Sequence, residues 1–142
     1  MDAPLASRDS FRLWTQERAR YADTDRQGHV NNAVFATFCE SGRVAFLYDG
    51  GASVAGPERS FVIARLVLDF RAELLYRDLV DIGTRVQEIR RSSLILGQGL
   101  FRGEECVATA EAVIVLVDNA TRRSTPLPDA LRQQLLALSD GG

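Results

Sequence analysis

The sequence predicts an α+β domain in which one five-stranded antiparallel sheet wraps around a single long helix. Residues 32–48 carry apolar side chains at the spacing of a helix face. Five other stretches are rich in Val, Ile, Leu and Phe, the composition of strands. Short links separate the last four of these stretches, and short links join antiparallel neighbours, because a parallel pair needs a crossover of about a dozen residues.

The first strand is expected before the helix and the other four after it. Their predicted ranges are residues 11–21, 61–71, 79–90, 93–102 and 105–117. Five strands over one helix leave a free sheet edge and an uncovered region. Pairing of two copies edge to edge would close both, so a homodimer is expected.

The long helix is expected to begin at Asn31 or Asn32, because Asn is a favoured N-cap residue. Gly50 and Gly51 are expected to end it. One face is apolar, and its members follow a spacing of three and four: Phe35, Phe38, Cys39, Gly42, Ala45 and Phe46. In the C-terminal tail, Pro128 is expected to open a short last helix.

With 142 residues, the chain is expected to form a single domain over residues 1–142, with its core at about 10–120. A net charge of −2 without a basic run argues against nucleic-acid binding. No apolar run is long enough to span a membrane, and Cys39 and Cys106 lie within apolar patterns typical of reduced thiols. A cytoplasmic protein without a membrane partner is expected. No Cys/His/Asp cluster indicates a metal, and no cofactor is expected.

The joint between the first strand and the helix, residues 20–32, holds the most informative motif. It reads Arg-Tyr-Ala-Asp-Thr-Asp-Arg-Gln-Gly-His-Val-Asn-Asn and contains the only histidine. A carboxylate next to the N-terminus of a buried helix suits hydrolysis of a carbonyl compound whose oxygen the helix amides polarise. Asp25 is the candidate. The alternative is that Asp25 only caps a turn, a place that Asp favours.

This motif resembles that of the hotdog-fold acyl thioesterases, the 4-hydroxybenzoyl-CoA thioesterase-like superfamily, in the branch that carries His-Val-Asn-Asn. The resemblance continues through Phe35 and the Glu40-x-x-Arg43 pair and covers about residues 10–120. It implies a thioesterase that hydrolyses acyl-CoA, and acyl-carrier-protein thioesters as a second substrate class. It implies that Asp25 is the catalytic base or nucleophile. It also implies an oxyanion contact from a backbone amide at Asn31 or Asn32. It further implies a homodimer or a homotetramer built from two dimers, with each acyl site between two subunits.

Several other residues have two interpretations. His29 either contacts the thioester or steadies the loop, and Asn31 and Asn32 divide between helix capping and a contact with water or the carbonyl. Phe35 is expected to line the acyl pocket. Glu40 is either a polar group in that pocket or the partner of Arg43 in a salt bridge. Arg90 and Arg91 at a hairpin end are candidates for the phosphates of coenzyme A. Two rival functions stay open: a non-catalytic acyl-CoA-binding protein, and a hotdog enoyl-CoA hydratase or dehydratase.

Overall fold

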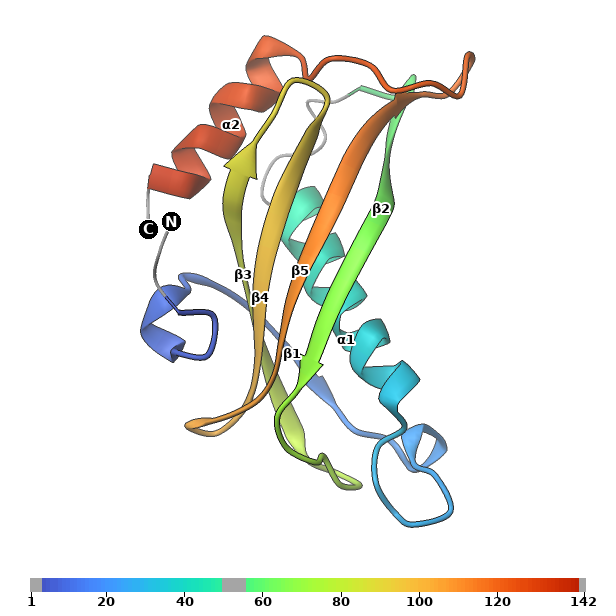
Figure 1. Ribbon diagram of the computed structural model, residues 1–142, viewed down its shortest axis with the longest axis vertical. Helices are drawn as coiled ribbons and strands as arrows, with labels where there is room; N and C mark the ends of the chain where they lie inside the picture. The colour runs from blue at the N-terminus through green and yellow to red at the C-terminus, as the bar shows by residue number, and fades with distance from the viewer. Residues whose placement is uncertain (1–3, 50–55, 141–142) are drawn as a thin grey trace.

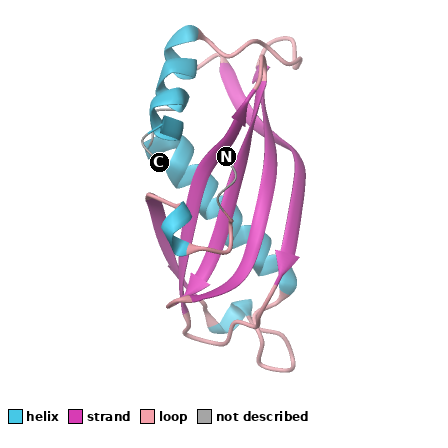
Figure 2. Ribbon diagram, turned by 60° about the vertical axis from the view of Figure 1, so that its left-hand side comes forward, coloured by secondary structure: helices cyan, strands magenta, loops and turns pink. Residues whose placement is uncertain are grey.

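Five strands form one antiparallel sheet that curls around the central helix α1, which lies along its concave face (Figure 1 and Figure 2). The structure is a computed structural model and describes residues 4–49 and 56–140. The strand order is β1-β3-β4-β5-β2, so β1 and β2 are the edges. This arrangement confirms the α+β, hotdog expectation. The elements are β1 Leu13–Arg18, α1 Asn32–Val44, β2 Arg59–Phe70, β3 Leu79–Ile89, β4 Ser93–Arg102, β5 Glu105–Asp118 and α2 Asp129–Asp140, with short turns of 3-10 helix at Arg8–Ser10 and Tyr21–Asp23.

Helix α1 begins where the Asn pair predicts. Asn31 is the N-cap, and its side-chain oxygen accepts a hydrogen bond from the backbone N–H of Ala33 at 2.9 Å. Gly42 lets the helix approach β3 closely, because a Cβ atom at this position would lie 2.5 Å from Cγ2 of Ile82. The apolar face is therefore held against the sheet at a glycine.

The predicted α-helix is too long at its C-terminal end. The α-helical pattern ends at Val44, and Ala45–Asp49 forms a π-helix. The wider turn lets the consecutive side chains of Phe46 and Leu47 both face the core. The predicted stop at Gly50 and Gly51 lies outside the described residues.

The predicted first strand is also too long. β1 spans Leu13–Arg18, and Tyr21–Asp23 turns into a 3-10 helix. The carboxylate of Asp23 accepts hydrogen bonds from the backbone N–H and the guanidinium of Arg20, which closes this turn and ends the extended chain.

Helix α2 protects the part of β3 that β1 does not reach. β1 pairs with β3 only as far as Thr84, and α2 packs against β3 beyond it. Leu131 and Leu135 of α2 are buried in one cluster with Val86 of β3. The predicted last helix is thus present, directly after Pro128. No helix in the described part of the chain is long and apolar enough to cross a membrane.

Candidate active site

The loop before α1 is closed on itself by backbone bonds. The N–H of Asp25 donates to the carbonyl of His29 at 2.8 Å, and the N–H of Gly28 donates to the carbonyl of Asp25 at 3.1 Å. Gly28 has φ = +85°, in the left-handed region that a residue without a side chain adopts at least cost. The motif therefore folds into a tight turn in which Asp25 and His29 are neighbours.

The carboxylate of Asp25 has one engaged oxygen and one open oxygen. Its Oδ1 accepts from the backbone N–H groups of Gln27 at 2.8 Å and His29 at 3.2 Å. Its Oδ2 has no partner among the described residues, and the side chain is exposed. Asp25 thus does what the turn-capping alternative predicts, and it keeps one oxygen for a water molecule or a substrate.

One backbone N–H at the start of α1 has no hydrogen-bond acceptor among the described residues. The N–H of Ala33 is taken by the Asn31 side chain, and the N–H of Val34 donates to the Asn31 carbonyl at 2.9 Å. The N–H of Asn31 donates to the carbonyl of Asp23 at 2.8 Å. In the described part of the chain nothing accepts from the N–H of Asn32. Of the two asparagines, Asn31 is the cap and Asn32 offers the donor at the positive end of the helix dipole.

Asp23, the second carboxylate of the motif, stabilises the local structure. Asp23 is buried, and its ion pair with Arg20 measures 2.8 Å. The hydrogen bond from Arg20 holds the pKa of Asp23 below its ordinary value against the opposing effect of burial. Asp23 fixes the turn that leads into the loop.

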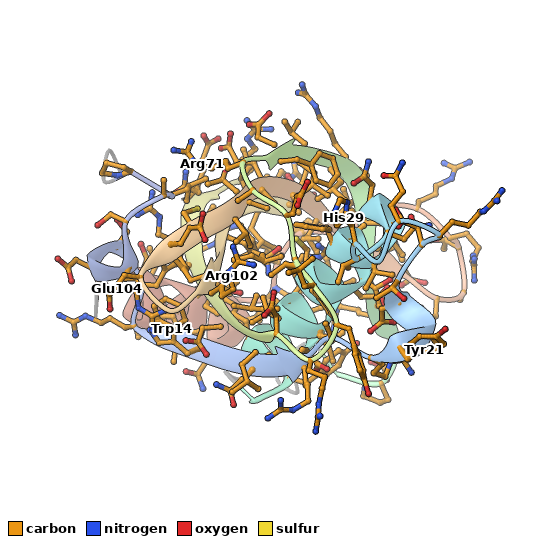
Figure 3. All side chains as sticks on the ribbon, turned by 90° about the horizontal axis from the view of Figure 1, so that it is seen from below. Trp14, Tyr21, His29, Arg71, Arg102 and Glu104 are labelled. Carbon is orange, nitrogen blue, oxygen red and sulfur yellow. The ribbon has the colours of Figure 1, made fainter. Side chains whose placement is uncertain are left out.

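His29 is half-buried, and its Nε2 lies 3.3 Å from a carboxylate oxygen of Glu73. A short antiparallel bridge joins His29 to Leu75, and the N–H of Val30 donates to the carbonyl of Leu74 at 2.8 Å. The link between β2 and β3 therefore runs beside the loop. Figure 3 shows His29 next to the start of α1 at this end of the molecule. Nothing in the local sequence around Glu73 marks it as a neighbour of His29.

An apolar wall leads from this loop to the edge of the sheet. Phe35 is buried on the first turn of α1, and its ring meets that of Phe70 edge to face, with ring centroids 5.2 Å apart. Phe70 ends β2 and is 49% exposed. Because β2 is an edge strand, this apolar surface ends at the sheet edge, where Phe70 is half exposed.

Of the two interpretations of Glu40, the salt bridge with Arg43 is wrong, because no ion pair joins these side chains among the described residues. Glu40 is exposed and lines a shallow groove between α1 and the edge strand β1. Arg43 is buried, and its guanidinium donates to the side-chain oxygen of Gln98 on β4 at 3.4 Å. Burial lowers the pKa of Arg43. The fully buried Gln98 is a polar core residue that the apolar pattern of its strand conceals.

Arg90 and Arg91 are not brought to Asp25 within one chain. They lie at the turn between β3 and β4, at the end of the molecule opposite the loop (Figure 1). Arg90 forms an ion pair with Glu88, and Arg132 of α2 donates to the carbonyls of both arginines. Within residues 4–49 and 56–140, no group of three or more His, Cys, Asp or Glu could hold a metal ion.

Comparisons with known proteins give the same family. A family model described as the thioesterase-like superfamily matches residues 19–135. The long-chain acyl-CoA thioesterase FadM of Escherichia coli is 28% identical over 127 residues, covering 87% of this chain and 96% of the relative. A solved thioesterase from Thermus thermophilus, complexed with coenzyme A and Zn, is 31% identical, with a TM-score of 0.81 over 92% of this chain and 96% of that one. The PA5185 protein of Pseudomonas aeruginosa is 27% identical, with a TM-score of 0.86 over 96% of this chain and 97% of that one. The chain belongs to the thioesterase-like superfamily.

Proposed function

We propose that this protein is a thioesterase that hydrolyses acyl-CoA at the Asp25 loop, with acyl-carrier-protein thioesters as a second substrate class. The observation that carries the proposal is the pairing of complementary groups in one closed loop. The loop presents a carboxylate oxygen of Asp25 without a partner and the N–H of Asn32 without an acceptor. The relatives named as thioesterases support the substrate class.

The chemistry follows from these two groups. The thioester carbonyl oxygen accepts from the N–H of Asn32, where the helix dipole favours the negative charge that develops during attack. Asp25 either takes a proton from a water molecule that adds to the carbonyl carbon, or attacks that carbon itself. In both routes the C–S bond breaks, the acyl group leaves as a carboxylate, and the thiolate of coenzyme A takes up a proton. In the second route water cleaves the intermediate anhydride.

We propose that a second copy completes the site by antiparallel pairing of β2 with β2. The two-fold axis of such a pair reverses the partner's strands. Phe70 at one end of β2 then lies next to Arg59 at the start of the partner's β2. The same reversal carries the partner's turn with Arg90 and Arg91 to the end of this chain that holds Asp25. In this assembly both arginines face the phosphates of the bound coenzyme, and the open wall of Phe35 and Phe70 is covered.

His29 and Glu40 have different places in the proposal. His29 sits in the loop itself, so it orients the loop or the thioester. Glu40 is exposed in the groove between α1 and β1, and a part in the acyl site would require contact with a partner copy.

The test is release of free thiol from a panel of acyl-CoAs that differ in chain length, with acyl-carrier-protein thioesters as a second panel. Steady turnover of at least one member is expected. Stoichiometric binding of acyl-CoA without thiol release would favour the non-catalytic acyl-binding protein. Hydration of an enoyl-CoA with the thioester intact would favour the hydratase or dehydratase. Loss of turnover on dilution to monomers would support the shared site.

A further inference from the structure

A separate cavity of about 130 Å³ lies between the second half of α1 and the edge strand β1. Its lining comes from β1, from β3, from the end of α1 and from the π-helix that follows α1: Leu13, Trp14, Thr15, Ile82, Thr84, Gly42, Ala45 and Phe46. None of the residues of the Asp25 loop lines it. An engineered apolar cavity of about 150 Å³ binds benzene, so a space of this size takes one aromatic ring or a short alkyl group.

The lining of the cavity carries a buried hydroxyl group whose hydrogen is unused. Thr84 is 2% exposed. The side-chain amide of Gln98 donates one hydrogen to the carbonyl of Cys39 at 2.9 Å and the other to Oγ1 of Thr84 at 3.0 Å. Thr84 is therefore the acceptor in its bond with Gln98. Its own O–H has no acceptor among the described residues, and Thr84 lines the cavity. A ligand with a hydrogen-bond acceptor at its inner end would satisfy it.

The mouth of the cavity is acidic. Thr15 and Ala45 also line a shallow groove that continues outward between β1 and α1. Glu17 and Glu40 line this groove, and no Arg lines it among the described residues. Two carboxylates favour a cationic group here and disfavour the phosphates of coenzyme A. The groove between β1 and α1 therefore does not suit an acyl-CoA thioester.

We propose that the cavity between α1 and β1 is a second small-molecule site, which takes a compact amine with an apolar body and a hydroxyl or carbonyl group at the far end. The acceptor group meets the Thr84 hydroxyl, the body packs between Leu13 and Phe46, and the ammonium group lies at Glu17 and Glu40. This site is independent of the proposed thioesterase activity.

Tyramine is the probe, because it has a phenol oxygen, one ring and an ammonium group in this order. Isothermal titration of the intact protein compares it with two matched compounds. Phenylethylamine lacks the acceptor, and 3-(4-hydroxyphenyl)propionate replaces the ammonium by a carboxylate. Tyramine is expected to bind, phenylethylamine to bind about tenfold more weakly for one lost hydrogen bond, and the carboxylate not to bind.

Two variants locate the binding. Ala45→Leu fills the cavity and is expected to abolish tyramine binding. Ala36→Leu in α1 is the matched control, because Ala36 lines neither the cavity nor the groove. Glu17→Gln is expected to lower the affinity for tyramine severalfold, whereas the weak affinity for an uncharged phenol stays the same. Circular dichroism confirms that each variant is folded. Absence of tyramine binding, equal binding of the carboxylate, or unchanged binding by a folded Ala45→Leu protein overturns the proposal.

Discussion

Glu73 lies 3.3 Å from Nε2 of His29, and this contact joins two parts of the chain that are far apart in sequence. His29 belongs to the loop of the candidate site, and Glu73 belongs to the link between β2 and β3. The contact gives the imidazole a fixed partner on the side that faces this link. We therefore expect Glu73 to position His29 in the candidate site.

Replacing Glu73 by Gln removes the charge and keeps the size. Since both side chains are partly exposed, the loss is expected to be about two- to fivefold in kcat, the effect of a polar contact at the surface, with little change in KM. Glu73→Asp should recover part of it. Steady-state kinetics of acyl-CoA hydrolysis measures both. Glu104→Gln, in the exposed turn between β4 and β5, is the control, and an equal effect of the two Gln variants would remove Glu73 from the site.

Asp23 is expected to make stability depend on pH. Its pKa is lowered in the folded protein because Arg20 donates to it. The stabilisation is fully present above the ordinary pKa of about 4 and is lost as the pH falls through the lower folded value. Asp23→Asn should cost about 1–3 kcal/mol at pH 7, since a buried acceptor is weakened. Urea unfolding at neutral and at strongly acidic pH measures the free energy of unfolding of the wild-type and Asp23→Asn proteins. The difference between these free energies should become smaller in acid. A constant difference would contradict this account.

Gly42→Ala is expected to destabilise the protein although Ala is the better helix former. The new methyl group would stand 2.5 Å from Cγ2 of Ile82 and 2.7 Å from Nε2 of Gln98. Overpacking of this kind costs about 1–3 kcal/mol, against a gain of about 1 kcal/mol in helix propensity. Thermal unfolding compares it with Ser41→Ala, the neighbouring position on the outer side. A rise in Tm for Gly42→Ala would show that helix and sheet are less tightly packed than described.

The thiol of Cys39 is expected to react only after unfolding. Burial raises the pKa of Cys39 to about 11. A thiolate is the reactive form, so labelling of the folded protein at pH 8 should be slow and should rise with pH well into the alkaline range. The Cys106→Ser variant leaves Cys39 as the only cysteine, and a chromogenic disulfide reagent measures its rate with and without urea. Fast labelling without urea would contradict the burial.

The sequence predicts the fold well because the signals are local. The apolar spacing of α1, the cap at Asn31 and the short links between strands each act within a few residues. The boundaries were less predictable. β1 ends early because Asp23 closes a turn on Arg20. The α-helical pattern ends at Val44 and continues as a π-helix, in which the consecutive residues Phe46 and Leu47 both face the core.

In the candidate site, too, the local contacts were predictable from the sequence and the long-range contacts were not. The turn that joins Asp25 to His29 follows from residues four apart with a glycine between them, and the sequence contains all of it. The partner of His29 and the partner of Arg43 depend on the register of distant strands. Glu73 reaches His29 through the bridge at Leu75, and Gln98 reaches Arg43 across the core. A pattern read along the chain does not contain these distances.

The most direct test of the proposed chemistry is Asp25→Asn, assayed for turnover and for binding of a non-hydrolysable acyl-CoA analogue. Asn keeps an oxygen that accepts from the N–H groups of Gln27 and His29, so the loop should keep its fold. We expect kcat to fall by about 100-fold or more, the range of a lost general base, while the dissociation constant of the analogue stays the same. Equal hydrolysis rates for the wild-type and Asp25→Asn proteins would contradict it.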